Sequence, residues 1–256
     1  MTIKYIHLHS IDSTNSFLRS HAPVESTDMT VVTADVQTAG RGQGTNSWES
    51  EEGKNLLFSL LIHPAFLPVS HQFLISKAMA LALYDTLIVY TGTGLSVKWP
   101  NDIYWNDSKI CGTLIETSLS AGRIKDFIIG TGVNVNQAVF RSDAPNPVSL
   151  FNIIRKETDR RLLLDTVIRH FEENLRELEE GRYQDISSRY HKCLYRGTGM
   201  HQYEDSSGIF MARIREVSAD GCLLLEDDTA CLRRYMFKEV KFVLPSSSEA
   251  GNLTLV

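Results

Sequence analysis

The chain has 256 residues, of which 43% are hydrophobic and 22% charged, and its formal net charge is −5. This composition is ordinary for a soluble globular protein, and a chain of this length can bury a stable core without metals or disulfides. The acidic balance argues against bulk electrostatic binding to DNA or RNA, although it leaves room for a local basic pocket that holds a small anion.

The compartment is indicated by what the chain lacks. Its N-terminus, MTIKYIHLHSIDST, has neither the basic start nor the long apolar run of a signal peptide, and no apolar stretch approaches the roughly 20 residues of a membrane span. The four cysteines form no C-x-x-C pair and show no zinc-ligand spacing: Cys111, Cys193, Cys222 and Cys231. Scattered cysteines are typical of reduced thiols, so we expect a cytoplasmic protein.

The first predicted elements are strands and one short helix. Residues 3–8 predict a strand, and residues 12–21 predict a helix whose leading aspartate or serine can cap it. Residues 29–37 predict a β-branched strand that runs directly into a glycine-rich loop. Residues 55–63 are a continuous apolar run, which is typical of a buried central strand.

The middle of the chain contains its clearest helix, at residues 71–92. This segment is apolar on nearly all sides and ends at Gly92, so we expect it to pack against a sheet. The following pattern predicts three strands, at 95–99, 109–119 and 127–135, a turn at 101–108, a loop at 141–149 and an amphipathic helix at 162–181.

The texture of the sequence changes after Cys193. Short strand-like pieces separated by turn residues predict a small barrel-like β domain. We therefore expect an α/β domain over residues 1–192, a β domain over 193–246 and a polar tail over 247–256.

The glycine-rich loop, QTAGRGQGTNSWE at residues 37–49, is the first candidate site. Its three glycines allow the backbone to approach a ligand closely, while Arg41 supplies a cation and Trp48 a flat ring. That combination suits an anionic ligand beside a planar ring. The plainer alternative is a flexible surface turn between two strands. A Walker phosphate loop is excluded, because the loop lacks a terminal GK[ST] and opens no helix.

A second candidate site surrounds the turn at Pro100 and Asn101. Lys98, Asp102 and Lys109 lie close to this turn in the sequence. Taken singly, each is more readily explained as a solvated lysine or as an aspartate that bonds local backbone. Together they are more suggestive, because a lysine can neutralise a carboxylate or phosphate, and an aspartate can hold Mg²⁺ or take a proton.

A third candidate lies in the last predicted strand of the α/β domain. Gly130 and Gly132 interrupt an apolar run, and Asn134 follows them. Glycine inside a strand often marks the close approach of backbone or ligand, and Asn134 can both donate and accept. A β-bulge whose end is capped by Asn134 explains the pattern equally well.

Five of these segments, taken in order, resemble the biotin–protein ligase family: DSTN, QTAGRG…W, KWPND, SKICGTLIE and IGTGVNVN, within residues 5–137. The resemblance implies an α/β catalytic domain like that of class II aminoacyl-tRNA synthetases, followed by an SH3-like β domain. It implies that biotin and Mg·ATP give biotinyl-5′-AMP, from which biotin passes to one lysine of a biotin carboxyl carrier protein domain.

The resemblance also implies roles for individual residues. Arg41, Lys109 and Asp102 would be catalytic; Arg41 and Lys109 would offset repulsion between biotin's carboxylate and the phosphates, and Asp102 would orient or deprotonate the acceptor lysine. The residues expected on biotin are Ser13, Thr14, Asn15, Gln37, Gly40, Arg41, Gly42, Gln43, Lys109 and Gly112. Those expected on ATP are Trp48, which would stack on adenine, with Lys98, Asn101, Asp102, Lys109 and Asn134.

No protein-only metal site is expected; Mg²⁺ would come with ATP, near Asp102. Alternatives within the fold are a lipoate or octanoate ligase, against which the missing RR-x-S-G-G-G type motif argues, and a non-catalytic biotin sensor. A DNA-binding repressor is disfavoured because the first strand begins almost at once. We expect a monomer or weak homodimer that binds neither nucleic acid nor membrane.

The loop departs from the family pattern at Gly44 and Thr45. Family members commonly carry a basic residue and then a glycine at these two places. Arg41 is therefore the only positive charge inside this loop, which predicts weaker retention of biotinyl-AMP. A lysine in place of Gly44 is expected to restore retention.

Overall fold

The structure is a computed structural model that describes residues 1–21, 28–142 and 144–244. The chain divides into two compact units, Met1–Tyr195 and Arg196–Val256. The division falls shortly after the boundary expected at residue 192. The expected polar tail, 247–256, lies outside the described residues.

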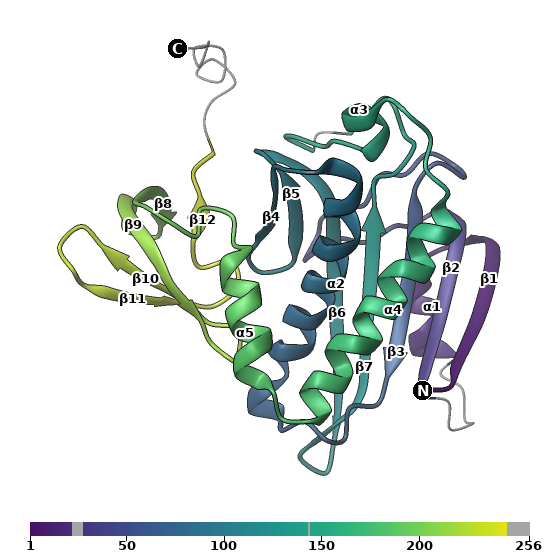
Figure 1. The fold of residues 1–256 in the computed structure, drawn as a ribbon, viewed down its shortest axis with the longest axis horizontal. Coiled ribbons are helices and arrows are strands. Elements are labelled where there is room, and N and C mark those ends of the chain that lie inside the picture. The colour runs from purple at the N-terminus through teal and green to yellow at the C-terminus, as the bar shows by residue number, and fades with distance from the viewer. Residues whose placement is uncertain (22–27, 143, 245–256) are drawn as a thin grey trace. The chain divides into compact units, whose positions relative to one another are not determined.

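The first unit is built on a seven-stranded mixed sheet (Figure 1). Its outermost pair, β1 and β2, is parallel, and every other neighbouring pair is antiparallel. The strands lie in the order β1 (Ile3–Ile11), β2 (Met29–Gln37), β3 (Leu56–Ile62), β7 (Arg123–Val133), β6 (Ser108–Ser120), β5 (Asp102–Trp105) and β4 (Leu95–Lys98). The continuous apolar run of β3 is explained by its position, because it is buried along its whole length.

Helices cover the sheet, with α2 and α4 on one face and α1 against the other (Figure 1). The helices of this unit are α1 (Thr14–Ser20), the 3₁₀ turn Val69–His71, α2 (Phe73–Thr91), α3 (Leu150–Ile154), α4 (Arg160–Glu179) and α5 (Tyr183–Lys192). The mixed α/β fold with a central sheet and flanking helices agrees with the sequence-based expectation.

Helix α2 corrects one expectation about membranes. The segment Val69–Thr91 spans 23 residues and is long and apolar enough to cross a membrane by length and composition alone. However, 72% of its most apolar stretch is buried inside the fold. It contacts α4, α5, the edge strand β4 and its neighbour β5, so its sides are apolar because protein surrounds them.

Strand alternation decides which side chains reach the face covered by α1. Leu18 of α1 packs with Val32, Leu61 and Ile128, which share that face of β2, β3 and β7. Farther along the same face, cross-strand pairing places Gly112 opposite Gly132 and Leu114 opposite Gly130. Because these glycines carry no side chains, the sheet is hollowed beside the N-terminus of α1.

Several expected boundaries were wrong. The turn expected at 101–108 contains strand β5, and two helices, α3 and α5, were not expected. Helix α4 begins at Arg160, because the Asp159 side chain accepts bonds from the N–H groups of Arg161 and Leu162. Ser13 is the N-cap residue of α1, but its side chain makes no capping bond.

The second unit contains an antiparallel sheet of five strands. Their order is β11 (Leu232–Tyr235), β10 (Leu223–Asp227), β9 (Gly208–Val217), β8 (His201–Asp205) and β12 (Lys241–Phe242). Tyr203, Leu223 and Leu225 are fully buried and form part of its core. The expected β domain is therefore present, while its SH3-like character stays a prediction.

Candidate active site

A cavity of about 680 Å³ opens over the hollowed face of the first unit. Most of the side chains expected at the site line it: Ser13, Thr14, Asn15, Gln37, Arg41, Gly42, Gln43, Trp48, Asn101, Asp102, Lys109, Gly112 and Asn134. Gly40 and Lys98 do not line it. Lys98 instead donates to the Tyr104 hydroxyl at 2.9 Å, and the backbone oxygen of Gly40 accepts the Trp48 N–H at 3.0 Å across the glycine-rich loop.

Three glycines, Gly112, Gly130 and Gly132, form the floor of this cavity, and we call them the glycine floor. A methyl group on Gly130 would overlap the Asn15 carboxamide, and one on Gly132 would overlap the Trp48 indole. A methyl on Gly112 would come within 2.9 Å of the same indole. The floor is therefore glycine because two side chains lie directly against its backbone.

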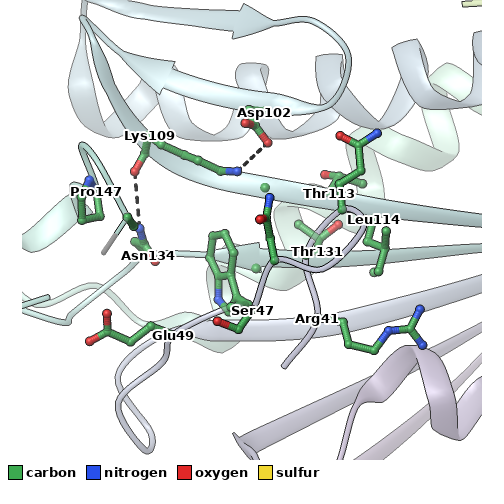
Figure 2. Close-up of a pocket in the computed structure, with 18 of the residues that line it drawn as sticks. Arg41, Ser47, Glu49, Asp102, Lys109, Thr113, Leu114, Thr131, Asn134 and Pro147 are labelled. Carbon is green, nitrogen blue, oxygen red and sulfur yellow. Dashed lines mark hydrogen bonds and ion pairs between the residues drawn. The ribbon is translucent and has the colours of Figure 1, made fainter. Parts of the chain in front are cut away.

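A β-bulge aims the lysine of the site. Asp102 of β5 pairs with Gly112 of β6, but the register shifts so that Tyr104 pairs with Lys109, leaving Ile110 as the extra residue. In a regular strand Lys109 and Gly112 would face opposite sides, and the extra residue turns both toward the cavity. Lys109 Nζ then lies 2.8 Å from Asp102 Oδ1 (Figure 2). The expected lysine–aspartate pair is thus brought together.

The glycine-rich loop forms a tight hairpin above the floor. Gly42 N–H donates to the Asn46 carbonyl at 2.7 Å, and the backbones of Arg41 and Ser47 form an isolated antiparallel β-bridge. Gly44 has a φ of 69°, in the left-handed region where a side chain is disfavoured. Gly44→Lys is therefore a poor test of the expected weak retention of biotinyl-AMP, because a lysine at this left-handed position would also strain the backbone.

Trp48 carries the hairpin onto the glycine floor. Its ring lies over Gly112 and Gly132, and Lys109 Nζ is 5.7 Å from the ring centroid. Its indole Nε1 is buried and has no hydrogen-bond partner among the described residues. A buried donor without a partner is unfavourable, so this N–H is available to a ligand.

Arg41 points away from Lys109 (Figure 2). Its Nη2 lies 2.6 Å from Glu116 Oε1 on β6, and Arg19 of α1 bonds the same oxygen. Burial disfavours the charged carboxylate, but the hydrogen bonds from Arg19 and Arg41 outweigh burial and lower the pKa of Glu116. Glu116 lies in the SKICGTLIE segment but was not expected at the site.

One side of the cavity is a polar wall formed by Thr14, Asn15 and Gln37, with Ser59 behind it. Gln37 Oε1 accepts from the Thr14 N–H at 2.8 Å and its hydroxyl at 3.1 Å. Ser59 Oγ lies 2.6 Å from both Thr14 Oγ1 and Asn15 Oδ1. Sequence reasoning missed Ser59, and its signal was a single hydroxyl in the otherwise apolar strand β3.

Two asparagines also line the cavity, and they differ in what they offer a ligand. Asn134 Nδ2 donates to the carbonyl oxygens of Val148, at 3.1 Å, and Lys109, while its buried Oδ1 has no partner among the described residues. Asn101 donates to the Thr113 carbonyl and accepts the Thr113 N–H at 3.0 Å. Asn134 therefore offers a free acceptor, whereas Asn101 mainly holds the turn.

Phe140, Ser142 and residues 144–147 also line the cavity, and most of them belong to the segment expected only as a loop. Glu49, just after the hairpin, holds this segment by accepting the N–H groups of Arg141 at 2.9 Å and Ser142 at 2.7 Å. Gln137 donates to the same carboxylate at 3.3 Å. Contacts of this kind between distant loops leave no local sequence signal.

Within the part of the chain that is described, no three His, Cys, Asp or Glu side chains gather as a metal site. Asp102 lines the cavity, and its carboxylate could serve as one ligand of a divalent cation.

The region of the chain that carries this cavity matches a known protein family. The model of the biotin/lipoate A/B protein ligase family matches residues 8–134, which carry most of the cavity. The chain is 29% identical over 231 residues to the bifunctional ligase/repressor BirA of Bacillus spizizenii, covering 88% of this chain and 70% of that protein. It is 30% identical over 165 residues to the biotin–[acetyl-CoA-carboxylase] ligase of Mycobacterium tuberculosis, covering 62% of this chain and 59% of that protein.

A solved structure agrees with this assignment. The biotin protein ligase of Aquifex aeolicus, in complex with biotin and ATP, superposes with a TM-score of 0.78 at 25% identity, covering 94% of this chain and 99% of that one. Sequence, fold and cavity lining agree, and residues 8–134 form a domain of the biotin/lipoate A/B protein ligase family.

Proposed function

We propose that this enzyme, a biotin–protein ligase, activates biotin with ATP to biotinyl-5′-AMP and transfers it to a lysine of a biotin carboxyl carrier protein domain. The observation that carries the proposal is one cavity that holds a polar wall at one side and the Lys109–Asp102 pair at the other, across the glycine floor. The two ends provide for the two demands of the first step, which are recognition of the acid and charge compensation at its carboxylate.

The polar wall favours biotin over lipoate. Biotin's ureido ring has donors and an acceptor that need partners once they are buried, and Thr14, Asn15 and Gln37 are placed to serve them. The dithiolane of lipoate has no such groups, so it would leave the wall unpaired, and unpaired buried polar groups discriminate strongly against a ligand. The cavity therefore supports the biotin reading.

Charge compensation is the main demand of the adenylation step. A biotin carboxylate oxygen attacks the α-phosphorus of ATP, and pyrophosphate leaves. Two anions approach each other only where cations lower their repulsion, and Lys109 already points into the cavity. Arg41 would have to leave Glu116 to contribute. In this proposal it does so when the hairpin that carries it closes over the ligands.

Asp102 serves the transfer step in this proposal. The amine of the acceptor lysine must be neutral to attack the acyl carbon, whereupon AMP leaves. Asp102 lies in the cavity and can accept the proton or orient the amine once Lys109 engages the adenylate.

The described residues fit ATP through Trp48 and Asn134, and they fit Mg²⁺ through Asp102. Trp48 offers a flat ring and a free N–H, and Asn134 a free acceptor, as a nucleotide base and ribose require. Mg²⁺ would be held by the triphosphate with Asp102 nearby, where it would neutralise phosphate charge. Because Trp48 lies on the floor, its ring must shift if biotin is to reach Gly112.

The partners and the compartment of the enzyme follow from the same proposal. The partners are biotin, ATP and the carrier domain of a carboxylase, and no nucleic acid or membrane. All four cysteines are free, which suits the reducing cytoplasm. We keep the expectation of a monomer or weak homodimer.

ATP–pyrophosphate exchange with biotin, compared with lipoate, tests the proposal. Biotin should support exchange, and exchange with lipoate alone would overturn it. Lys109→Ala and Arg41→Ala should each lower the rate by roughly 100-fold, whereas Lys125→Ala, an exposed lysine outside the cavity, should leave it unchanged. Near-normal exchange in both cavity variants would refute the roles given to these cations.

A further inference from the structure

We propose that Glu116 is a positioning residue that sets the direction of hydrogen bonding through the polar wall on which biotin binds. The inference rests on the proposed function, because biotin is the ligand of that wall. Glu116 does not line the cavity, so it acts on the ligand through another side chain, Asn15.

Glu116 receives hydrogen bonds from two elements besides its own strand. Asn15 Nδ2 donates to Glu116 Oε2 at 3.0 Å, and Arg41 Nη2 donates to Oε1 at 2.6 Å. Arg19 donates to Oε1 as well. The carboxylate is half-buried against β7 and α1, and the two arginines keep it ionised, so it can only accept.

An acceptor-only partner determines the orientation of the Asn15 carboxamide. The amide nitrogen must face Glu116 and the Leu114 carbonyl, to which it also donates at 3.3 Å. The amide oxygen must therefore face Ser59, and Ser59 must use its single hydroxyl hydrogen as the donor in that 2.6 Å contact.

The hydrogen-bond direction that is fixed at Asn15 and Ser59 also fixes the role of the Thr14 hydroxyl in the cavity. With its hydrogen committed to Asn15, Ser59 can only accept from Thr14. The single hydroxyl hydrogen of Thr14 is then directed to Ser59, and Gln37 keeps the Thr14 backbone N–H as its donor. The Thr14 hydroxyl oxygen is thereby left to accept from the cavity, as a ureido N–H requires. Gln37 Oε1 is held independently by the Thr14 backbone N–H, and Gln37 Nε2 is left to donate into the cavity. A ureido carbonyl requires such a donor.

Glutamine at position 116 would remove this constraint. A carboxamide both donates and accepts, so position 116 would no longer require a donor from Asn15, and only the 3.3 Å bond to the Leu114 carbonyl would hold the Asn15 carboxamide in this orientation. Glu116→Gln should therefore raise the KM for biotin roughly tenfold, a typical loss for an unpaired buried polar group, while the KM for ATP stays within about twofold.

Arg19→Gln is the matched control for charge. It removes one arginine from the same carboxylate oxygen and leaves the Asn15–Glu116 bond in place. Its KM for biotin should stay within about twofold of the unmodified enzyme. An increase equal to that of Glu116→Gln would show that ion pairing is responsible, and the proposal would fall.

An exchange of the two groups provides the decisive rescue. In Asn15→Asp combined with Glu116→Gln, the glutamine amide donates to the new carboxylate at position 15, and the other oxygen of that carboxylate still accepts from Ser59. The double variant should recover at least part of the KM for biotin relative to either single variant. A residue that only supported the fold would show no such recovery.

Biotin-dependent pyrophosphate exchange by the unmodified full chain is measured first, so that failure of the proposed function is recognised separately. Given that activity, a KM for biotin unchanged in Glu116→Gln, or a double variant no better than the single ones, overturns the inference. If Glu116→Gln does not fold, the comparison of Asn15→Asp with the double variant decides the same question.

Discussion

At the scale of single residues, the site depends on side chains that are absent as much as on those present. Gly112, Gly130 and Gly132 leave the space that Asn15 and Trp48 occupy. Gly130 and Gly132 stood out in the sequence as interruptions of an apolar strand, but only the structure shows which side chain uses each gap. The same holds for Arg41, whose cationic role was inferred but whose partner, Glu116, was not.

Gly130→Ala should disable the polar wall. The added methyl overlaps the Asn15 carboxamide, so Asn15 must leave Ser59 and Glu116. Biotin affinity, measured by titration calorimetry, should fall at least roughly tenfold while the circular dichroism spectrum is retained. Ser120→Ala, at the exposed end of β6, is the control. Unchanged biotin affinity would show that Asn15 is not needed where it stands.

Thr45→Lys should test the unusual loop better than a change at Gly44. Gly44 needs its left-handed backbone, whereas Thr45 has no positive φ and borders the cavity. A second cation there should slow release of biotinyl-AMP several-fold, because the adenylate is anionic. Rapid-filtration measurement of adenylate release decides the matter, and an unchanged rate would remove the loop cation as a cause of retention.

At the scale of elements, the cavity is assembled by contacts between loops that are far apart in the sequence. Glu49 ends the hairpin and accepts the N–H groups of Arg141 and Ser142, in the segment that supplies another part of the cavity lining. Burial disfavours the charged carboxylate, but hydrogen bonds from Ser142, Arg141 and Gln137 outweigh burial and lower the pKa of Glu49. The hairpin and this segment are therefore coupled.

Glu49→Gln should weaken ATP binding. The neutral amide accepts the two N–H groups less strongly, so the segment beside Asn134 becomes less ordered. The KM for ATP should rise several-fold, with a smaller change for biotin. The pKa of Glu49 is lowered in the folded protein. The ionised carboxylate therefore stabilises this contact fully above the ordinary pKa of glutamate, and that stabilisation is lost as pH falls through the lowered value. Glu51→Gln, an exposed neighbour, is the control, and equal KM values in both variants would contradict the coupling.

At the scale of the whole molecule, each of the two units is stabilised internally in a different way. The first buries a large apolar sheet, whereas the second relies in part on a charged network around Asp227, which is only 5% exposed. Asp227 accepts from the Thr229 hydroxyl and N–H, from Cys231 N–H and from Arg233. These hydrogen bonds lower its pKa to about 2.

The second unit should therefore lose stability in acid. Asp227 stabilises the fold fully above its ordinary pKa of 3.8, and this contribution is lost as pH falls through the folded value of about 2. Asp227→Asn should remove part of this pH dependence and speed hydrogen exchange in residues 201–242 at neutral pH, while exchange in the first unit is unchanged. Asp228→Asn, at an exposed neighbour, should have no effect. Equal exchange in both variants would contradict the assignment.

The sequence by itself determined the α/β class, the apolar core strand β3 and the long helix α2, and most of the site residues that it predicted line the cavity. It could do so because periodicity, glycine placement and short motifs are local properties of the chain. It did not reveal strand β5, since four residues beside a turn carry too little pattern.

Only the tertiary structure decided which of these residues act together. The bulge at Ile110 turns Lys109 toward Asp102, cross-strand register places the three glycines side by side, and α1 brings Asn15 to Glu116. Glu116, Ser59 and Glu49 work through partners tens of residues away, and a contact between distant segments depends on register and packing that no short stretch of sequence encodes.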